Sequence, residues 1–174
     1  WSAETGQAMA SFKGHAGTIG TVAFAGDSEL LSGSADKGAF VWSAEPGWIL
    51  ERSIGSIEDS TVLADRVMAL DFNTDGSLLV AGGGVPSRYG EVKIFNTADG
   101  ALVRALAEPH TDGVLGVSFS PDGSMIATCG ADKYVKVFAT ATGELIRPFE
   151  GHTEYVLGVS WKSDSRSLAS CGAD

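Results

Sequence analysis

The stretch MIATCGADKYVKVF (residues 125–138) decides the fold, because it recurs. Apolar and polar residues alternate through YVKVF, as in a β-strand with one buried face, and a turn-forming Gly-Ala-Asp separates it from the strand-like segment before it. A near copy, SLASCGAD, occupies residues 167–174, 42 positions later. A strand–turn–strand unit that returns at this distance predicts a fold built from repeats.

Three further series of markers return at spacings of 41 to 53 residues. One is an aromatic residue that in three copies lies nine positions after a His, as in GHAGTIGTVAF (14–24), PHTDGVLGVSF (109–119) and GHTEYVLGVSW (151–161). The other two are a ring residue that closes a strand and a glycine in the turn that follows it. Their members are Trp1, Trp42, Phe95 and Phe138 for the ring, and Gly6, Gly47, Gly100 and Gly143 for the turn.

The segments between these markers have the pattern of short β-strands. TIGTVAF, GAFVW and EVKIF alternate with a period of two and are bounded by Gly, Asp or Asn. A 3.6-residue apolar period long enough for a helix does not occur. Each repeat therefore predicts a four-stranded antiparallel meander, and the chain predicts an all-β fold.

The order of GH, SFSPDG, ATCGAD, VKVF and a TG turn resembles the WD-repeat β-propeller family over the whole chain. The WD dipeptide itself is degenerate, for example Trp42-Ser43 and Phe138-Ala139, so the resemblance rests on the wider pattern. It implies a partial or half ring of four-stranded antiparallel blades within one propeller segment. We expect blades at approximately 1–13 (last strand only), 14–54, 55–108, 109–150 and 151–174 (truncated).

On this blade pattern both ends of the sequence fall inside a blade, so the chain is expected to be a piece of a longer array. About four blades do not usually close a WD-repeat ring, and each blade needs neighbours to bury its apolar faces. We therefore expect self-association, as a dimer of half-rings, or a place in a longer propeller.

One polar set recurs in three of the blades. A His, a Ser or Thr, and an Asp four residues after the Ser or Thr return at matched positions, which suggests at first a Ser-His-Asp hydrolase. A catalytic triad occurs once, whereas a structural device repeats in every blade. The resemblance implies a buried hydrogen-bond network that in the first blade includes Trp42, so we expect no catalytic residue. The sets are His15, Ser32 and Asp36; His110, Thr128 and Asp132; and His152, Ser170 and Asp174.

The second blade departs from this pattern. Leu63 occupies its His position and the turn Asp is missing. Extra residues lie in two connections, within 55–65 and 84–90, which the propeller strand order places on one face. Two interpretations are open: the longer connections bind a partner, or a blade without its network simply tolerates them. The candidate partner-binding residues are Pro86, Arg88, Tyr89, Glu58 and Asp59.

Residues just before the first strand of each blade are expected to line the same face. The candidates are Thr18, Asp112 and Tyr155, with Lys37 and Lys133 nearby. The three His residues of the chain all belong to the predicted polar sets, so we expect no metal site, and no motif indicates a cofactor.

The charge excludes two classes of partner. With 12 basic and 22 acidic residues the formal net charge is −10, which disfavours binding to nucleic acid or to an anionic membrane. The sequence therefore predicts a non-catalytic protein–protein interaction scaffold that favours a basic partner. The alternative is the WD-repeat region of a larger bacterial enzyme or c-type cytochrome-linked protein, suggested by GGGVPSRYGEVKIF (82–95), and a haem absorption band would separate the two.

Overall fold

The structure, a computed structural model, describes residues 2–25, 28–43 and 49–174. The predicted markers Trp1 and Gly47 lie outside the described residues. Within the described ranges the regular structure consists of β-strands without a helix, arranged in separate antiparallel sheets. This confirms the all-β prediction.

Three of the sheets have four strands each, and a fourth sheet has two. Each sheet is a meander in which strands adjacent in the sequence pair with one another. The first sheet contains β1 (Ile19–Ala25), β2 (Glu29–Ser34), β3 (Ala39–Ser43) and β4 (Ile49–Ile54). The second contains β5 (Val67–Phe72), β6 (Leu78–Val85), β7 (Tyr89–Asn96) and β8 (Leu102–Ala105). The third contains β9 (Val114–Phe119), β10 (Met125–Gly130), β11 (Val135–Ala139) and β12 (Leu145–Phe149), and the fourth contains β13 (Val156–Trp161) and β14 (Leu168–Gly172).

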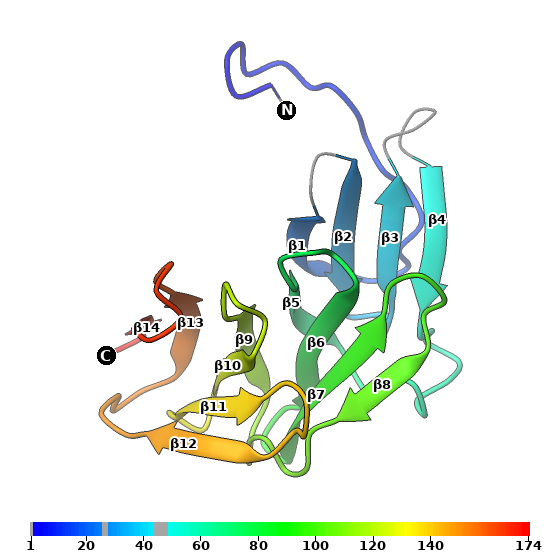
Figure 1. Cartoon of the computed structure of the whole chain (residues 1–174). Coiled ribbons are helices and arrows are strands. Elements are labelled where there is room, and N and C mark those ends of the chain that lie inside the picture. Colours follow the sequence, from blue (N-terminus) through cyan, green and yellow to red (C-terminus); the bar gives the residue numbers. More distant parts are fainter. Residues whose placement is uncertain (1, 26–27, 44–48) are drawn as a thin grey trace.

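The sheets stand side by side in sequence order and form an open arc (Figure 1). The first strand of each sheet contacts the first strand of the next, so that β1, β5, β9 and β13 follow one another along the arc. In the three larger sheets β4, β8 and β12 form the far edge. This arrangement is a partial ring of propeller blades, as the repeat pattern predicts.

Turns between third and fourth strands share one construction. The amide of Gly100 donates to the carbonyl of Asn96, and that of Gly143 donates to the carbonyl of Ala139, both at 2.8 Å. Both glycines have a positive φ, 74° and 75°, which other residues adopt only with strain. The turn at residues 2–7 has the same hydrogen bonds, with Gly6 at a φ of 68°.

The last strand expected within residues 1–13 is not formed in the part of that range that the structure describes. Near the end of this range the side chain of Phe12 contacts the first sheet, where its ring lies 5.3 Å from that of Trp42.

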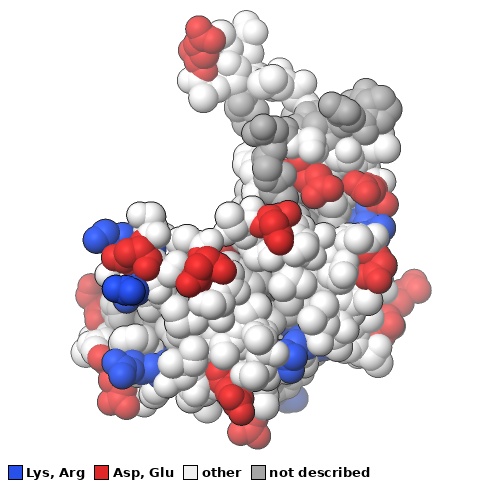
Figure 2. Space-filling view, in the orientation of Figure 1, with Lys and Arg blue, Asp and Glu red and all other residues white. Residues whose placement is uncertain are grey.

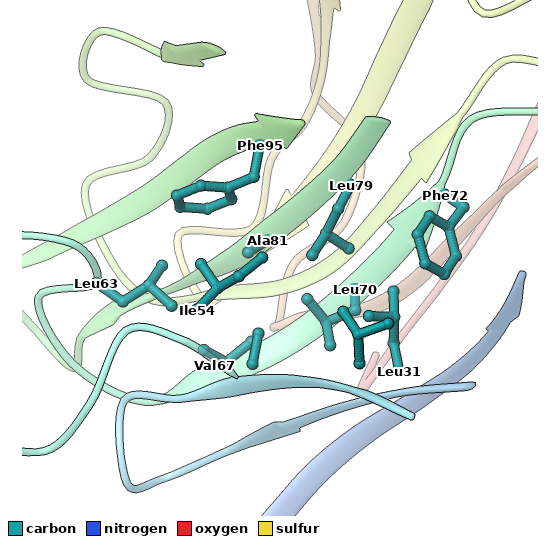
Figure 3. Close-up of a cluster of buried hydrophobic side chains, with 11 residues drawn as sticks. Leu31, Ile54, Leu63, Val67, Leu70, Phe72, Leu79, Ala81 and Phe95 are labelled. Carbon is teal, nitrogen blue, oxygen red and sulfur yellow. The ribbon is translucent and has the colours of Figure 1, made fainter. Parts of the chain in front are cut away.

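Apolar side chains fill the spaces between neighbouring sheets. Figure 3 shows the first of these clusters, in which Leu31 and Ile54 of the first sheet face Leu70, Leu79 and Phe95 of the second. A second cluster joins the second sheet to the third and includes Phe138 of β11. Burial of such a side chain stabilises the fold by about 1.5–3 kcal/mol, so these clusters hold the blades together.

A partly buried carboxylate joins the second and third sheets through a hydrogen bond. The backbone N–H of Phe119 on β9 donates to Oδ2 of Asp71 on β5 at 2.8 Å. Burial raises the pKa of the Asp71 carboxyl, although hydrogen bonds from the amides of Phe119 and Phe72 oppose the change.

Candidate functional site

The predicted polar set of the first sheet is assembled in the structure. Nδ1 of His15 lies 2.9 Å from Oδ2 of Asp36, and its Nε2 lies 2.8 Å from Oγ of Ser32. Nε1 of Trp42 donates to the same Ser32 Oγ at 2.9 Å. Because the carboxylate only accepts, Nδ1 of His15 donates to it, and Nε2 is then free to accept from the Ser32 hydroxyl.

The third sheet repeats this arrangement without the ring donor. Nδ1 of His110 lies 2.8 Å from Asp132 Oδ1, and Nε2 lies 2.8 Å from Thr128 Oγ1. Phe138 stands where the first sheet has Trp42, and its ring carries no N–H. The His110 and Asp132 side chains are 0% and 5% exposed, so this network belongs to the interior.

In the fourth sheet the same contacts lie open to solvent. Nδ1 of His152 is 2.8 Å from Asp174 Oδ1, and Nε2 is 2.9 Å from Ser170 Oγ. Both the His152 and Asp174 side chains are about one quarter exposed, at 23% and 24%. The structure thus brings together every predicted member of the three sets.

The turn Asp has a second role, which is to fasten the loop that enters each blade. Oδ2 of Asp36 accepts the N–H of Ala16 at 2.8 Å, and Oδ2 of Asp132 accepts that of Thr111 at 3.1 Å. Burial raises the pKa of both carboxyls, but hydrogen bonds from the neighbouring His and backbone N–H outweigh burial and leave each pKa below its usual value. Both groups are therefore ionised at neutral pH, and their hydrogen bonds satisfy polar groups that would be costly to bury unpaired.

The second sheet performs the same fastening with different residues, which the sequence reasoning missed. Leu63 is buried at the His position. Oε2 of Glu91, on β7, accepts the N–H of Ala64 at 2.9 Å. Oε1 of Glu91 pairs with Nζ of Lys93 at 2.6 Å, and Nζ also donates to the carbonyl of Val62 at 2.7 Å. Glu91 thus replaces the turn Asp from the third strand.

A sequence signal for the Lys93 contact existed. Lys136 stands at the same position of the third sheet, two residues before the ring residue, in VKVF as Lys93 does in VKIF. Its Nζ donates to the carbonyl of Pro109, the residue before His110, at 2.7 Å. A lysine at this position therefore holds the entry loop in both blades.

The inserted residues of the second sheet prolong a hairpin. Strands β6 and β7 have eight residues each and pair up to Val85 and Tyr89, so the turn carries the predicted Pro86 and Arg88 beyond the length of the other blades. Ser87 adopts a left-handed φ of 58°, and its N–H donates to Oδ1 of Asp112 at 2.6 Å. The hairpin tip is thereby held against the entry loop of the third sheet.

The other insertion is attached to the same strand. Its first part forms a turn in which the N–H of Asp59 donates to the carbonyl of Ser56, and Glu58 and Asp59 are exposed. Hydrogen bonds from Thr61 lower the pKa of the Asp59 carboxyl. The later part is fastened by Glu91 and Lys93, so β7 carries one insertion at its start and holds the other near its middle.

The remaining candidates lie in other blades. The carbonyl of Thr18 accepts the N–H of Ala35 in the first sheet, and that of Tyr155 accepts the N–H of Ala173 in the fourth. Nζ of Lys133 donates to the carbonyl of Thr153 at 2.6 Å, next to Tyr155. The structure therefore joins Asp112 to the hairpin tip but keeps Thr18 and Tyr155 apart from it.

We call the residues Pro86, Arg88, Tyr89 and Asp112 the hairpin-tip surface. The backbone N–H of Arg88 donates to the carbonyl of Val85 at 3.1 Å, but its exposed guanidinium makes no hydrogen bond or ion pair with any residue that the structure describes. The side chain of Tyr89 is 43% exposed. Arg and Tyr are enriched at protein interfaces and among their hot spots. Acidic side chains are spread over the face of the molecule in Figure 2.

The described residues offer neither a metal site nor a membrane-spanning helix. No group of three or more His, Cys, Asp or Glu there is placed to hold a metal ion. The described ranges also contain no helix of the length and apolarity needed to cross a membrane.

Known proteins resemble this chain along most of its length. Apoptotic protease-activating factor 1 of Rattus norvegicus is 42% identical over 158 residues, which cover 86% of the chain and 12% of that protein. WD repeat-containing protein SL1-17 of Schistosoma mansoni is 31% identical over 149 residues, which cover 85% of the chain and 45% of that protein. The chain thus spans less than half the length of these relatives.

Solved structures show the same fold. The chain superposes on a structure of U3-55K with a TM-score of 0.75 and 22% identity, covering 84% of the chain and 43% of that structure. The WD domain, G-beta repeat (WD40) family matches residues 6–43, 56–96, 100–138 and 143–174. The chain therefore belongs to the WD40 family, whose members are generally non-enzymatic scaffolds for protein interactions.

Proposed function

We propose that this chain is a non-catalytic interaction scaffold that binds a protein partner at the hairpin-tip surface. One observation carries this proposal. A hydrogen bond holds the longer hairpin of the second blade in place, and yet the side chains of Arg88 and Tyr89 on it are exposed to solvent. A hairpin kept only because it is tolerated has no need of a fixed tip.

Two contacts hold this surface. Besides the bond from Ser87 to Asp112, the N–H of Gly90 donates to the carbonyl of His110 at 2.8 Å. His110 is itself locked in the polar network of the third sheet. A surface held in its binding geometry loses less conformational entropy on association, which favours affinity.

The charge of the chain indicates the chemistry of the partner. A formal net charge of −10 attracts a basic segment and speeds its encounter. Glu58 and Asp59, exposed on the other insertion held by β7, add acidic groups. The guanidinium of Arg88 would then pair with a carbonyl or carboxylate of the bound segment, while the ring of Tyr89 packs against its side chains.

A display selection tests this proposal with peptides in place of the natural partner. Peptides are selected from a random library against the chain, and their affinities are then measured for the Arg88→Ala/Tyr89→Ala variant and for a control, Arg147→Ala/Lys162→Ala, whose exposed side chains lie on β12 and just after β13. We expect the first variant to lose at least roughly tenfold in affinity, as hot-spot residues do, and the control to retain it. Equal affinity of the peptides for the wild type and both variants would contradict the proposal, and the longer connections would then be insertions that the blade merely tolerates.

We also propose that the chain self-associates as a dimer of half-rings. Val22 and Phe24 on β1 are 60% and 72% exposed, and Leu157 on β13, at the other end of the arc, is 54% exposed. Apolar sheet faces of this kind are buried between neighbouring blades elsewhere in the chain. Light scattering should give twice the mass of 18.0 kDa; a monomer at all concentrations would contradict this part of the proposal.

A further inference from the structure

A groove with a volume of about 680 Å³ lies between the first and second sheets. One wall consists of the end of β1, the start of β2 and Glu51 on β4, and the other includes residues 73–77 and 97–98 of the second sheet. These residues precede β6 and follow β7, whereas the hairpin tip joins β6 to β7. The groove and the hairpin-tip surface therefore lie at opposite ends of the second sheet (Figure 1).

The charged side chains that line this groove are acidic. Glu29, Glu51 and Asp75 contribute carboxylates, and no Lys or Arg is found among the lining residues that the structure describes. The carboxylate of Asp75 accepts hydrogen bonds from the N–H and the hydroxyl of Ser77. The carboxylates of Glu29 and Glu51 make no hydrogen bond or ion pair with any described residue. Both are therefore available to a ligand.

The position of Glu29 is apolar in the two sheets that follow. Glu29 begins β2 and pairs with the residue directly after the ring residue of the third strand. Leu78 and Met125 make the same pairing in the second and third sheets. Leu78 packs against the apolar cluster between these sheets. A partly buried glutamate thus replaces a residue that elsewhere packs between blades.

The position of Glu51 shows the same change. Glu51 lies at the irregularity in the pairing of β4 with β3, as Val103 does in β8 and Ile146 in β12. Both of these equivalents are exposed apolar side chains. The first sheet therefore has a carboxylate at two positions that are apolar in the others, and both carboxylates line one groove.

The arginine beside Glu51 joins the two sheets and recurs. Nη1 of Arg52 donates to the carbonyl of Thr97 in the second sheet, and Nη1 of Arg104 donates to that of Thr142 in the third. The arginine is thus a repeated contact between neighbouring blades. The two glutamates do not recur, so the packing of the blades does not account for them.

We propose that this groove binds an arginine-containing segment of a partner protein. Guanidinium groups form charge-assisted and often bidentate hydrogen bonds with carboxylates, and the net charge of −10 favours a cationic ligand. Such a ligand supplies partners for Glu29 and Glu51 without any movement of the blades. This site is separate from the hairpin-tip surface and does not depend on it.

The spacing of the two glutamates indicates the spacing of the arginines. Strand β3 separates β2 from β4, so the backbones at Glu29 and Glu51 lie about 10 Å apart, or two strand spacings. In a polyproline II segment, side chains three residues apart share one face at a separation of about 9 Å. The groove therefore fits the pattern Arg-x-x-Arg, with one guanidinium for each glutamate.

A labelled peptide of sequence GRPPRG tests this assignment. Its binding to the 174-residue chain is followed by fluorescence anisotropy. We expect saturable binding that weakens as salt is added, because ion pairs at the surface are screened. The same peptide with citrulline in place of both arginines keeps the shape without the charge and should not bind. The peptide GPRRPG, which has equal charge but adjacent arginines, should bind more weakly.

Two variants of the chain locate the binding site. Glu29→Gln/Glu51→Gln should weaken binding of GRPPRG by roughly three- to thirtyfold, as expected for the loss of two ion pairs. The control Glu144→Gln/Glu154→Gln removes the same charge from two exposed positions outside the groove and should retain the affinity. Urea unfolding of each variant checks that the fold is intact.

Several results would overturn the proposal. These are no saturable binding of GRPPRG at millimolar concentration, equal affinity of the citrulline peptide, or equal losses in the groove variant and its control. Equal affinity of GRPPRG and GPRRPG would contradict the Arg-x-x-Arg spacing. The Arg88→Ala/Tyr89→Ala variant should bind GRPPRG as the wild type does, so failure of the hairpin-tip proposal is distinguishable from failure of this one.

Discussion

Glu91 accepts the backbone N–H of Ala64 at 2.9 Å and so does for the second blade what a turn Asp does for the first and third. The carboxylate comes from a different strand and has a longer side chain, but it reaches the same point of the entry loop. The entry loop of the second blade is therefore held in place although this blade lacks the His and the turn Asp.

Removal of the Glu91 carboxylate should destabilise the fold. Glu91→Ala leaves the N–H of Ala64 unpaired and removes the carboxylate that pairs with Lys93, whose side chain is only 12% exposed. We expect a loss of about 1–3 kcal/mol in the free energy of unfolding, measured with urea. Glu58→Ala, at an exposed position, should change it by less than about 0.5 kcal/mol. Equal changes in the free energy of unfolding for the two substitutions would show that the Glu91 carboxylate does not stabilise the entry loop.

A buried polar network should contribute more to the free energy of unfolding than an exposed one. Thr128→Val leaves Nε2 of the buried His110 without a partner and should cost about 1–3 kcal/mol. Ser170→Ala removes the same contact at an exposed position, where water takes its place, and should cost much less. Urea unfolding of both variants checks this. A loss of unfolding free energy as large for Ser170→Ala as for Thr128→Val would mean that exposure to solvent does not weaken this hydrogen bond.

Asp132 should support the fold only above acidic pH. Its pKa in the folded chain lies below the ordinary value of 3.8, because contacts with His110 and Thr111 outweigh burial. The stability it contributes is present above pH 3.8 and is lost as the pH falls through the folded pKa. The stability difference between the wild type and Asp132→Asn should therefore shrink below about pH 3.8 in urea titrations. A difference that stays constant as the pH falls well below that value would contradict this.

Asp71 should show the opposite pH dependence. Burial raises its pKa in the folded chain above 3.8, so its contribution is fully present below that value and is lost as the pH rises through the folded pKa. Asn does not titrate, and its side-chain oxygen can still accept the N–H of Phe119. The stability of Asp71→Asn relative to the wild type should therefore rise between about pH 3 and about pH 7. An unchanged relative stability would place Asp71 in a less buried environment.

Much of this molecule is predictable from its sequence because each repeat can be compared with the others. The spacing of the network residues recurs in three blades, and this recurrence identifies them as a set without any knowledge of the structure. The spacing also locates the departures of the second blade, Leu63 and the longer hairpin. The contacts that Leu63 and the longer hairpin make cannot be predicted by such a comparison, since no other blade has these features.

Two features depend on the third dimension. Glu91 lies outside the turn where the Asp is expected, and only the pairing of β6 with β7 brings it to Ala64. The segment before Gly14 has a strand-like place in the pattern, but the part of it that the structure describes contains no strand, and the ring of Phe12 packs on that of Trp42. Sequence patterns show which residues favour a strand and not whether a neighbour is present.

The affinity of a display-selected peptide for the wild-type chain and for Arg88→Ala/Tyr89→Ala tests the proposed function most directly. If the hairpin-tip surface binds partners, the double variant loses at least roughly tenfold in affinity while Arg147→Ala/Lys162→Ala does not. Unchanged affinity in the double variant, with its unfolding free energy intact, would show that the longer hairpin of the second blade is not a binding site.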